Sequence, residues 1–346
     1  MKTSKTSEWL DGGDLLKEKP KPIDWFLEDI LPIGAVGDVF SPPGAGKSTL
    51  LTSLMLAVAG SKRQWFGKRC VSGGVLALGG EKSSRDVWVR DLHRAAGTEM
   101  FDIEPGRLMI APPTIGPLFV WDARAKVWQR GRGYDPAVQQ AIVIRPALTI
   151  IDTIGRAAAG QDPISIPQQQ ALAEEFEDLG REIGGTLLTV SHTSQASGSE
   201  DVQQRLHYTS RAGSNGIPGH LRWLMGMTLL TPKEVSELTP IPADEVGRRQ
   251  MIAVAVSKHS EMPQPAGWNR FDPSIFEMMP DGSVMAIPKY LKEYRVVPPP
   301  KSRRGLGNLV GKGAQEYDKQ NKQSNGDGDA RSPAGQTKDE DLAWLK

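Results

Sequence analysis

Apolar runs of strand length alternate with helical patterns through most of the chain. The first run, AVGDVF over 35–40, is followed by a glycine-rich loop and an apolar helix over 50–60. A second strand over 73–80 precedes a helix over 84–96, where apolar residues recur at helical spacing. Strands over 147–152 and 184–192 follow, with a helix over 168–183 between them. This order predicts an α/β fold, in which helices cover both faces of a mostly parallel central sheet.

The rest of the chain predicts an insertion, two closing strands and two appendages. Residues 106–133 indicate a short strand and a small β-hairpin, and the apolar runs 222–230 and 251–256 would complete the sheet. We therefore expect one main domain over 31–297. An N-terminal arm over 1–30 would lie on this domain as a lid or on a neighbouring subunit. A flexible polar tail over 298–346 is expected because it has few apolar residues.

Composition limits the partners and the cellular locations that can be expected for the protein. The 346 residues carry a formal net charge of +1, so a uniformly basic nucleic-acid coat is excluded and any DNA contact must be local. The single cysteine excludes an internal disulfide framework and favours a reducing, cytoplasmic location. No apolar run has the roughly twenty residues needed to cross a bilayer, so no membrane partner is expected.

The loop SPPGAGKST over 41–49 has the chemistry of a phosphate site. Glycines let backbone N–H groups surround an anion, a lysine reaches the β and γ phosphates of ATP, and a hydroxyl binds Mg²⁺. The first glycine of the usual pattern is Ser41 here, at the exit of the strand, where it should not abolish binding. The predicted ATP-binding residues of this loop are Pro43, Gly44, Ala45, Gly46, Lys47, Ser48 and Thr49, with Ser48 as a magnesium ligand.

Three polar residues follow predicted strands, where ligand chemistry occurs in parallel sheets. Asp152 would hold Mg²⁺, although it could instead cap the next helix. Glu81 would orient and deprotonate the attacking water, unless it is an ordinary surface glutamate. His192 would sense the γ phosphate, although a lone histidine is more often structural.

Together these residues resemble the RecA-like ATPases that include DnaB, KaiC and the hexameric replicative helicases of the plasmid RepA type. The resemblance runs from about Asp24 to Tyr294 and rests on SPPGAGKST, LALGGEKSS, LTIIDTIGRA, LLTVSHTS, SRAGSNG and VAVSKHSEMPQPAGW. It implies that Arg90 contributes to nucleotide binding. It also implies that Lys258 and Arg222 enter the ATP site of the neighbouring subunit, with Arg211 as an alternative to Arg222. Where the DnaB group often has a second basic residue after the lysine, this chain has His259 and Ser260.

The resemblance further implies that two loops contact single-stranded DNA in the pore of a hexameric ring. The first follows Asp152 and the second runs from Thr193 to about Gly219, so Arg156, Arg205 and Arg211 are the candidate phosphate contacts. The expected function is an ATP- and Mg²⁺-dependent DNA helicase, moving 5′ to 3′, that replicates a plasmid or mobile element. A primase or initiator could bind the tail, whose last residues are DEDLAWLK. A DNA-binding recombinase or a KaiC-like regulatory ATPase remains the alternative.

Overall fold

A computed structural model describes residues 11–60, 63–79, 84–97, 102–194, 201–239, 241, 250–260, 268–279 and 283–286. Contacts divide the chain into Met1–Arg295 and Val296–Lys346, and every described residue belongs to the first unit. The predicted tail over 298–346 and the first ten residues therefore lie outside the described residues.

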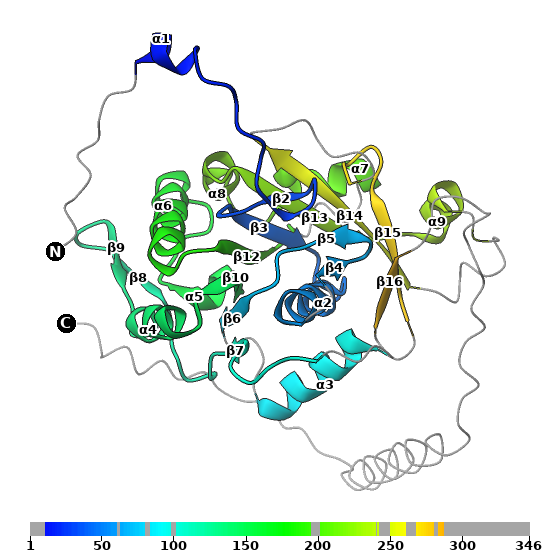
Figure 1. Ribbon diagram of the computed structural model, residues 1–346, viewed down its shortest axis with the longest axis horizontal. Coiled ribbons are helices and arrows are strands. Elements are labelled where there is room, and N and C mark those ends of the chain that lie inside the picture. The colour runs from blue at the N-terminus through cyan, green and yellow to red at the C-terminus, as the bar shows by residue number, and fades with distance from the viewer. Residues whose placement is uncertain are drawn as a thin grey trace, which may run out of the picture. The chain divides into compact units, whose positions relative to one another are not determined.

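A nine-stranded sheet forms the centre of the described structure, in the order β16-β15-β14-β13-β3-β12-β10-β6-β7 (Figure 1). The strands from β7 to β13 are parallel, and the last three pair antiparallel. This confirms the predicted α/β fold with a mostly parallel central sheet. The strands are β3 (Val36–Ser41), β6 (Gly74–Gly79), β7 (Leu108–Ile110), β10 (Pro146–Asp152), β12 (Thr186–His192), β13 (Trp223–Leu229), β14 (Gln250–His259), β15 (Ser274–Met278) and β16 (Val284–Ala286).

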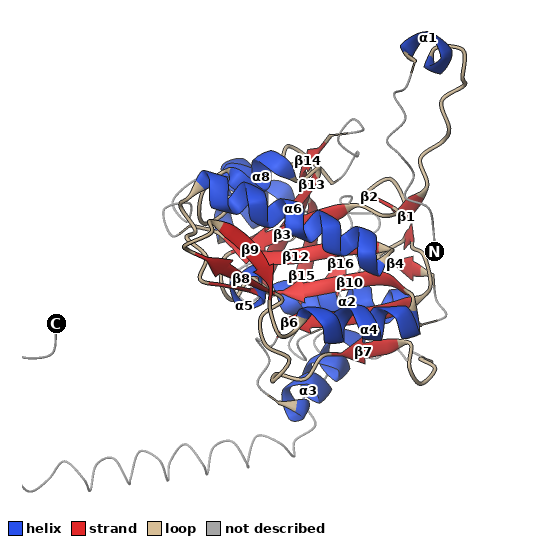
Figure 2. Cartoon of the chain, turned by 90° about the vertical axis from the view of Figure 1, so that its left-hand side faces the viewer, coloured by secondary structure: helices blue, strands red, loops and turns tan. Residues whose placement is uncertain are grey.

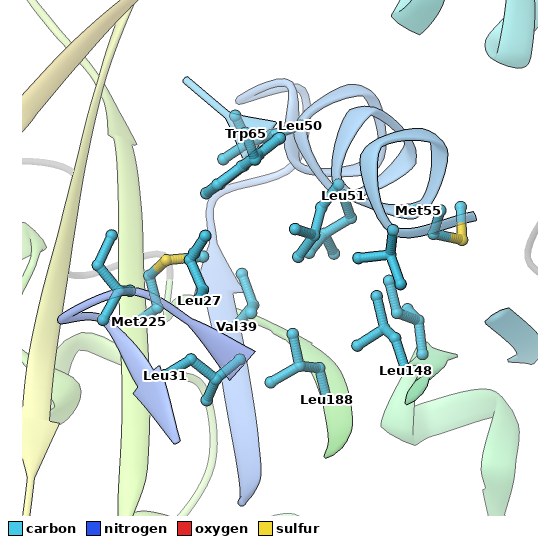
Figure 3. Close-up of a cluster of buried hydrophobic side chains, with 14 of the residues drawn as sticks. Leu27, Leu31, Val39, Leu50, Leu51, Met55, Trp65, Leu148, Leu188 and Met225 are labelled. Atoms are coloured by element: carbon cyan, nitrogen blue, oxygen red, sulfur yellow. The ribbon is translucent and has the colours of Figure 1, made fainter. Parts of the chain in front are cut away.

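Successive residues of each strand point to opposite sides of the sheet. Both sides are apolar here, so helices cover both faces. In β6, Val75 and Ala77 belong to one buried cluster, whereas Leu76 and Leu78 belong to another. The first cluster packs under α2 (Lys47–Ala59) and α3 (Arg85–Ala96). Figure 3 shows part of it, with leucines of α2 above strand residues such as Val39.

The second cluster packs under α4 (Tyr134–Ile144) and α6 (Ile166–Ile183), which lie on the other face (Figure 2). The predicted hairpin is confirmed as β8 (Phe119–Asp122) and β9 (Val127–Arg130), and its strand β8 also pairs with the short β11 (Ala158–Ala159). Strands β15 and β16 were not predicted, and they extend the sheet beyond the two closing strands.

The described part of the predicted arm has an exposed beginning and an end that packs in the core. It contains α1 (Gly12–Leu15), and then β1 (Trp25–Leu27) pairs with β2 (Leu31–Pro32). Phe26, Leu27 and Ile30 are buried in the same cluster as α2. The remaining short elements are β4 (Gln64–Trp65), β5 (Lys68–Arg69), α5 (Ile154–Ala157), α7 (Val202–Arg205), a 3-10 turn at Tyr208–Ser210, α8 (Gly216–His220) and α9 (Pro232–Leu238).

Candidate active site

The phosphate loop joins the end of β3 to the start of α2. Gly44 and Gly46 have φ angles of 76° and 79°, a left-handed conformation that glycine adopts at little cost. No side chain caps the helix at Gly46, so the first N–H groups of α2 are available to an anion. Ser41, which replaces the usual first glycine, is buried, and its hydroxyl donates to the Pro42 carbonyl at 3.0 Å. The substitution therefore lies within the strand end and leaves the loop itself intact.

Lys47 reaches the end of the neighbouring strand β12. Its Nζ donates to the Ser191 carbonyl at 3.1 Å and lies 3.4 Å from Nδ1 of His192. The register of the sheet explains this contact, because His192 pairs with Ser41 at the end of β3. The structure thus places the predicted phosphate lysine and the predicted sensor histidine side by side.

Ser48 and Asp152 meet across the same edge of the sheet. The Ser48 hydroxyl donates to Oδ2 of Asp152 at 3.4 Å, and both residues border a small pocket between α2 and the strand ends. A hydroxyl and a carboxylate are oxygen ligands of the kind that Mg²⁺ prefers. The two residues therefore fit a magnesium site beside the phosphate loop.

Gly79 allows the ends of β6 and β10 to approach each other closely, a role that was not predicted from the sequence. It pairs with Asp152 in register and has a φ of 120°. A Cβ at this position would collide with the backbone of Asp152. Glu81, the predicted catalytic base, follows two residues later and lies outside the described residues. The doubled glycine after an apolar run was the available signal for such a close approach.

Asp38 is a second residue that sequence reasoning missed. It lies in β3 with no exposed surface, and its carboxylate accepts from Thr189 at 2.9 Å and from Ser191 at 2.6 Å. Nε of Arg211 donates to the same carboxylate at 2.8 Å, and Arg211 is itself buried. A charged residue within an apolar strand run was the only sequence signal for this buried ion pair.

Lys258 and Arg222 lie away from the phosphate loop of their own chain. In the sheet, Lys258 of β14 pairs with Leu224 of β13, and Leu224 pairs with Asp38 of β3. Asp38 lies three residues before the end of β3. At about 3.3 Å per residue, that position is about 10 Å from the phosphate end of the strand. The Lys258 ammonium instead donates to the Pro218 and Gly219 carbonyls, at 2.7 and 3.2 Å.

The electrostatic setting of Lys258 also differs from that of a surface lysine. Burial lowers its pKa below the ordinary value, and the nearby guanidinium of Arg222 lowers the pKa further. Arg222 is exposed and borders an open pocket of about 460 Å³, together with Trp223, His259 and Ser260.

The predicted DNA contacts fall into two groups. Arg156 is exposed in α5, directly after Asp152. Arg205 and Arg211 are both buried, and Arg205 donates to Glu234 at 2.8 Å and to Thr228 at 3.0 Å. These ion pairs occupy both guanidinium groups within the chain, which differs from the expected role as solvent-facing phosphate contacts. Arg90, the remaining nucleotide candidate, is exposed on α3.

Two further observations concern metal binding and membrane crossing. Among the residues that the structure describes, no group of three or more His, Cys, Asp or Glu side chains could hold a metal ion by itself. None of the described helices combines the length and the apolar character that crossing a bilayer requires.

Comparison with known proteins identifies the family of this chain. The family described as "AAA domain" matches residues 2–198, which is more than half of the 346 residues. A KaiC-like protein of the archaeon Pyrococcus horikoshii OT3 is 13% identical with a TM-score of 0.43, and the alignment covers 76% of this chain and 94% of that one. A second solved structure, described as an ATPase domain, is 11% identical with a TM-score of 0.49, covering 73% and 85% respectively. The family match spans the phosphate loop, Asp152 and His192, and the chain therefore belongs to the AAA domain family of P-loop ATPases.

Proposed function

We propose that this protein is a ring-forming, ATP-driven DNA helicase of the plasmid RepA type, which splits ATP between adjacent subunits. One observation carries the proposal. Lys47, Ser48, Asp152 and His192 gather at the carboxyl ends of neighbouring strands, whereas Lys258 projects away from that edge toward α8. A second copy of the chain would be needed to bring Lys258 to a phosphate.

Within one subunit, the residues divide the work of phosphoryl transfer. The N–H groups of the glycine loop and Lys47 bind the phosphates and orient them. Ser48 and Asp152 would hold Mg²⁺, which neutralises phosphate charge when bound. Glu81 would take the proton of the attacking water, since its strand ends at Gly79 beside Asp152. His192, in contact with Lys47, would sense the γ phosphate.

Lys258 and Arg222 are proposed to act on the phosphates of the neighbouring subunit, where their charge stabilises the transferring group. Before that, Lys258 is held by the carbonyl oxygens at the end of α8. Entry into a neighbouring site would exchange these two carbonyl acceptors for phosphate oxygens. Hydrolysis would then depend on assembly.

Single-stranded DNA is proposed to contact the loops that follow Asp152 and His192. Arg156 is the exposed cation of the first loop. In the second loop, the exposed backbone at Gly213 could approach a phosphate without reading sequence, whereas Gly216 is buried and its N–H donates to the Ser214 hydroxyl at 3.3 Å. Plasmid replication, the 5′ to 3′ direction, the hexameric ring and binding of a primase or initiator by the tail belong to the same proposal.

The decisive experiment mixes two inactive variants. Lys47→Ala and Lys258→Ala should each abolish ATPase activity and unwinding of forked DNA, and an equimolar mixture should recover part of both. A monomer that hydrolyses ATP at the full rate would contradict shared sites. ATPase activity that single strands do not stimulate would favour a KaiC-like regulatory ATPase. Stimulation without strand separation would favour a recombinase.

A further inference from the structure

The buried carboxylate of Asp38 connects three segments that are distant in the sequence. Its partners are Thr189 and Ser191 of β12 and Arg211, which lies 173 residues away. Ser191 is also the residue whose carbonyl accepts from Lys47. One side chain in β3 is therefore bonded both to the strand that contacts the phosphate lysine and to the segment that contains Arg211.

Arg211 stands where the second loop returns to the sheet. The loop leaves β12 at Thr193, and Thr193 forms an isolated β-bridge with Arg211. The N–H of Ala212 donates to the His192 carbonyl at 2.8 Å, and the N–H of Ser194 donates to the Ser210 carbonyl at 2.8 Å. Both ends of the loop are thus fixed beside the sensor histidine, although 195–200 lie outside the described residues.

The chemistry of this contact favours the transmission of small displacements. A buried ion pair contributes little net stability compared with apolar packing, but it is directional, and breaking one partner leaves an uncompensated charge. Hydrogen bonds in such a buried network also strengthen one another. The Ser191 hydroxyl and the Arg211 guanidinium share Oδ2 of Asp38, so a shift of one changes the position of the other.

We propose that Asp38 is a positioning residue that couples the phosphate site to the second loop through Arg211. The inference rests on the proposed ATP site. When phosphate draws the Lys47 ammonium away from the Ser191 carbonyl, the end of β12 loses one of its partners. The Asp38 carboxylate then carries the resulting shift of Ser191 to Arg211 and the loop. In the reverse direction, a ligand that moves the loop changes the environment of Lys47 and His192.

The chain offers a matched control for this proposal. Arg205 belongs to the same segment and is also buried, but its carboxylate partner is Glu234 in α9, which also accepts from Thr231, the residue that caps this helix. Asp38→Asn and Glu234→Gln each neutralise one carboxylate with almost no change of shape. Both leave their arginine in place, so Glu234→Gln shows the effect of losing an ion pair elsewhere in the same segment.

The test measures amide hydrogen exchange over 201–216 with and without a non-hydrolysable ATP analogue and Mg²⁺. In the unmodified chain, the analogue should change exchange rates in this segment by at least about fivefold. Asp38→Asn should remove most of that difference while the affinity for the analogue stays within about threefold. Glu234→Gln should keep the difference.

Several results would overturn the inference. The first is that the analogue does not change exchange over 201–216 in the unmodified chain. The second is that Asp38→Asn keeps the full change in exchange. The third is that Glu234→Gln loses as much of this change as Asp38→Asn does. If Asp38→Asn does not fold, Ser191→Ala removes the hydroxyl and keeps the ion pair, and it should reduce the response; an unchanged response would contradict the coupling. ATPase stimulation by single strands, measured in parallel, separates the two proposals. A loop that responds to nucleotide in a protein indifferent to DNA would support the coupling and reject the helicase.

Discussion

The Ser48 hydroxyl and the Asp152 carboxylate lie within hydrogen-bonding distance, 3.4 Å apart, although 104 residues separate them in the sequence. Ser48 belongs to the first turn of α2, and Asp152 ends β10, which is separated from β3 by β12. This contact brings the two proposed metal ligands together across the width of three strands.

Ser48→Ala and Asp152→Asn should weaken ATP binding only when Mg²⁺ is present. Ser48→Ala removes an oxygen ligand, and Asp152→Asn removes the negative charge and one of the two carboxylate oxygens; both leave the glycine loop and Lys47 unchanged. We expect a loss of about tenfold in affinity, or about 1.4 kcal/mol, with Mg²⁺ and little change with a chelator. Titration with a fluorescent ATP analogue under both conditions measures this. An equal loss in both conditions would show that the residues do not act through a metal.

Lys47→Met should reduce ATPase kcat by about 100-fold or more, since the variant removes the cation that we propose to bind the transferring phosphate. A methionine of similar length should preserve packing at this buried position, so thermal unfolding should change little. Lys68→Met is the control, because Lys68 belongs to β5 and pairs with Asp29, at 3.1 Å, and not with a residue of the phosphate site. A comparable loss of kcat in the control would contradict a specific role for Lys47.

Gly79→Ala should destabilise the protein by about 2 kcal/mol or more, because the new Cβ meets the backbone of Asp152 and the φ of 120° strains any other residue. Gly67→Ala is the matched control. Its φ is 76°, but nothing lies within 4 Å of the added Cβ, so only the smaller conformational cost of about 1 kcal/mol applies. Denaturant unfolding compares the two. Equal costs would show that the strand ends can separate freely.

The pH dependence of ATPase activity should reflect the lowered pKa of Lys258. Burial and Arg222 disfavour its charged form, so the ammonium loses its proton below the ordinary value of 10.5 as pH rises. The proposed role of Lys258 requires its charged form. As pH rises, kcat/KM should therefore begin to fall before pH reaches 10.5. Lys258→Arg keeps its charge and should move this limb to higher pH. An unchanged limb would assign it to another group.

Glu234 should stabilise the fold in a pH-dependent way. Burial alone would raise its pKa, but the hydrogen bonds from Arg205 and Thr231 prevail and lower the pKa below 4.5. The stabilisation is therefore fully present above pH 4.5 and is lost as pH falls through the lowered pKa. The difference in unfolding free energy between the unmodified chain and Glu234→Gln should be about 1–3 kcal/mol at neutral pH and should shrink in acid. Unfolding at several pH values tests this, and a constant difference would contradict it.

Local patterns were sufficient to predict the sheet and the phosphate loop. A parallel strand covered on both faces is apolar at nearly every position, and AVGDVF and LTIIDT show this directly. The loop over 41–49 is equally local, because its glycines, Lys47 and Ser48 are consecutive. The placement of Asp152 and His192 then follows from strand ends that share one edge.

Partners that are distant in the sequence could not be predicted in the same way. Arg205 and Arg211 stand in a polar, glycine-rich stretch, which is typical of a solvent-facing loop. Their partners are Glu234, 29 residues away, and Asp38, 173 residues away, and no local pattern indicates either pairing. Asp38 itself interrupts an apolar strand, and only the folded arrangement shows which charge it balances. The antiparallel β15 and β16 were missed because their short runs carry no strong alternation.

The reversed direction of β14 has a consequence for how copies of the chain could associate. Because β14 runs against its neighbours, Lys258 near its end emerges away from the edge that holds Lys47. An interface that joins these two features pairs different residues on the two partners, because Lys258 of one copy meets the phosphate loop of another. A two-fold dimer satisfies such a contact only if both features lie on one shared face; on separate faces, the contact continues from copy to copy and either closes into a ring by rotation or grows into an open filament.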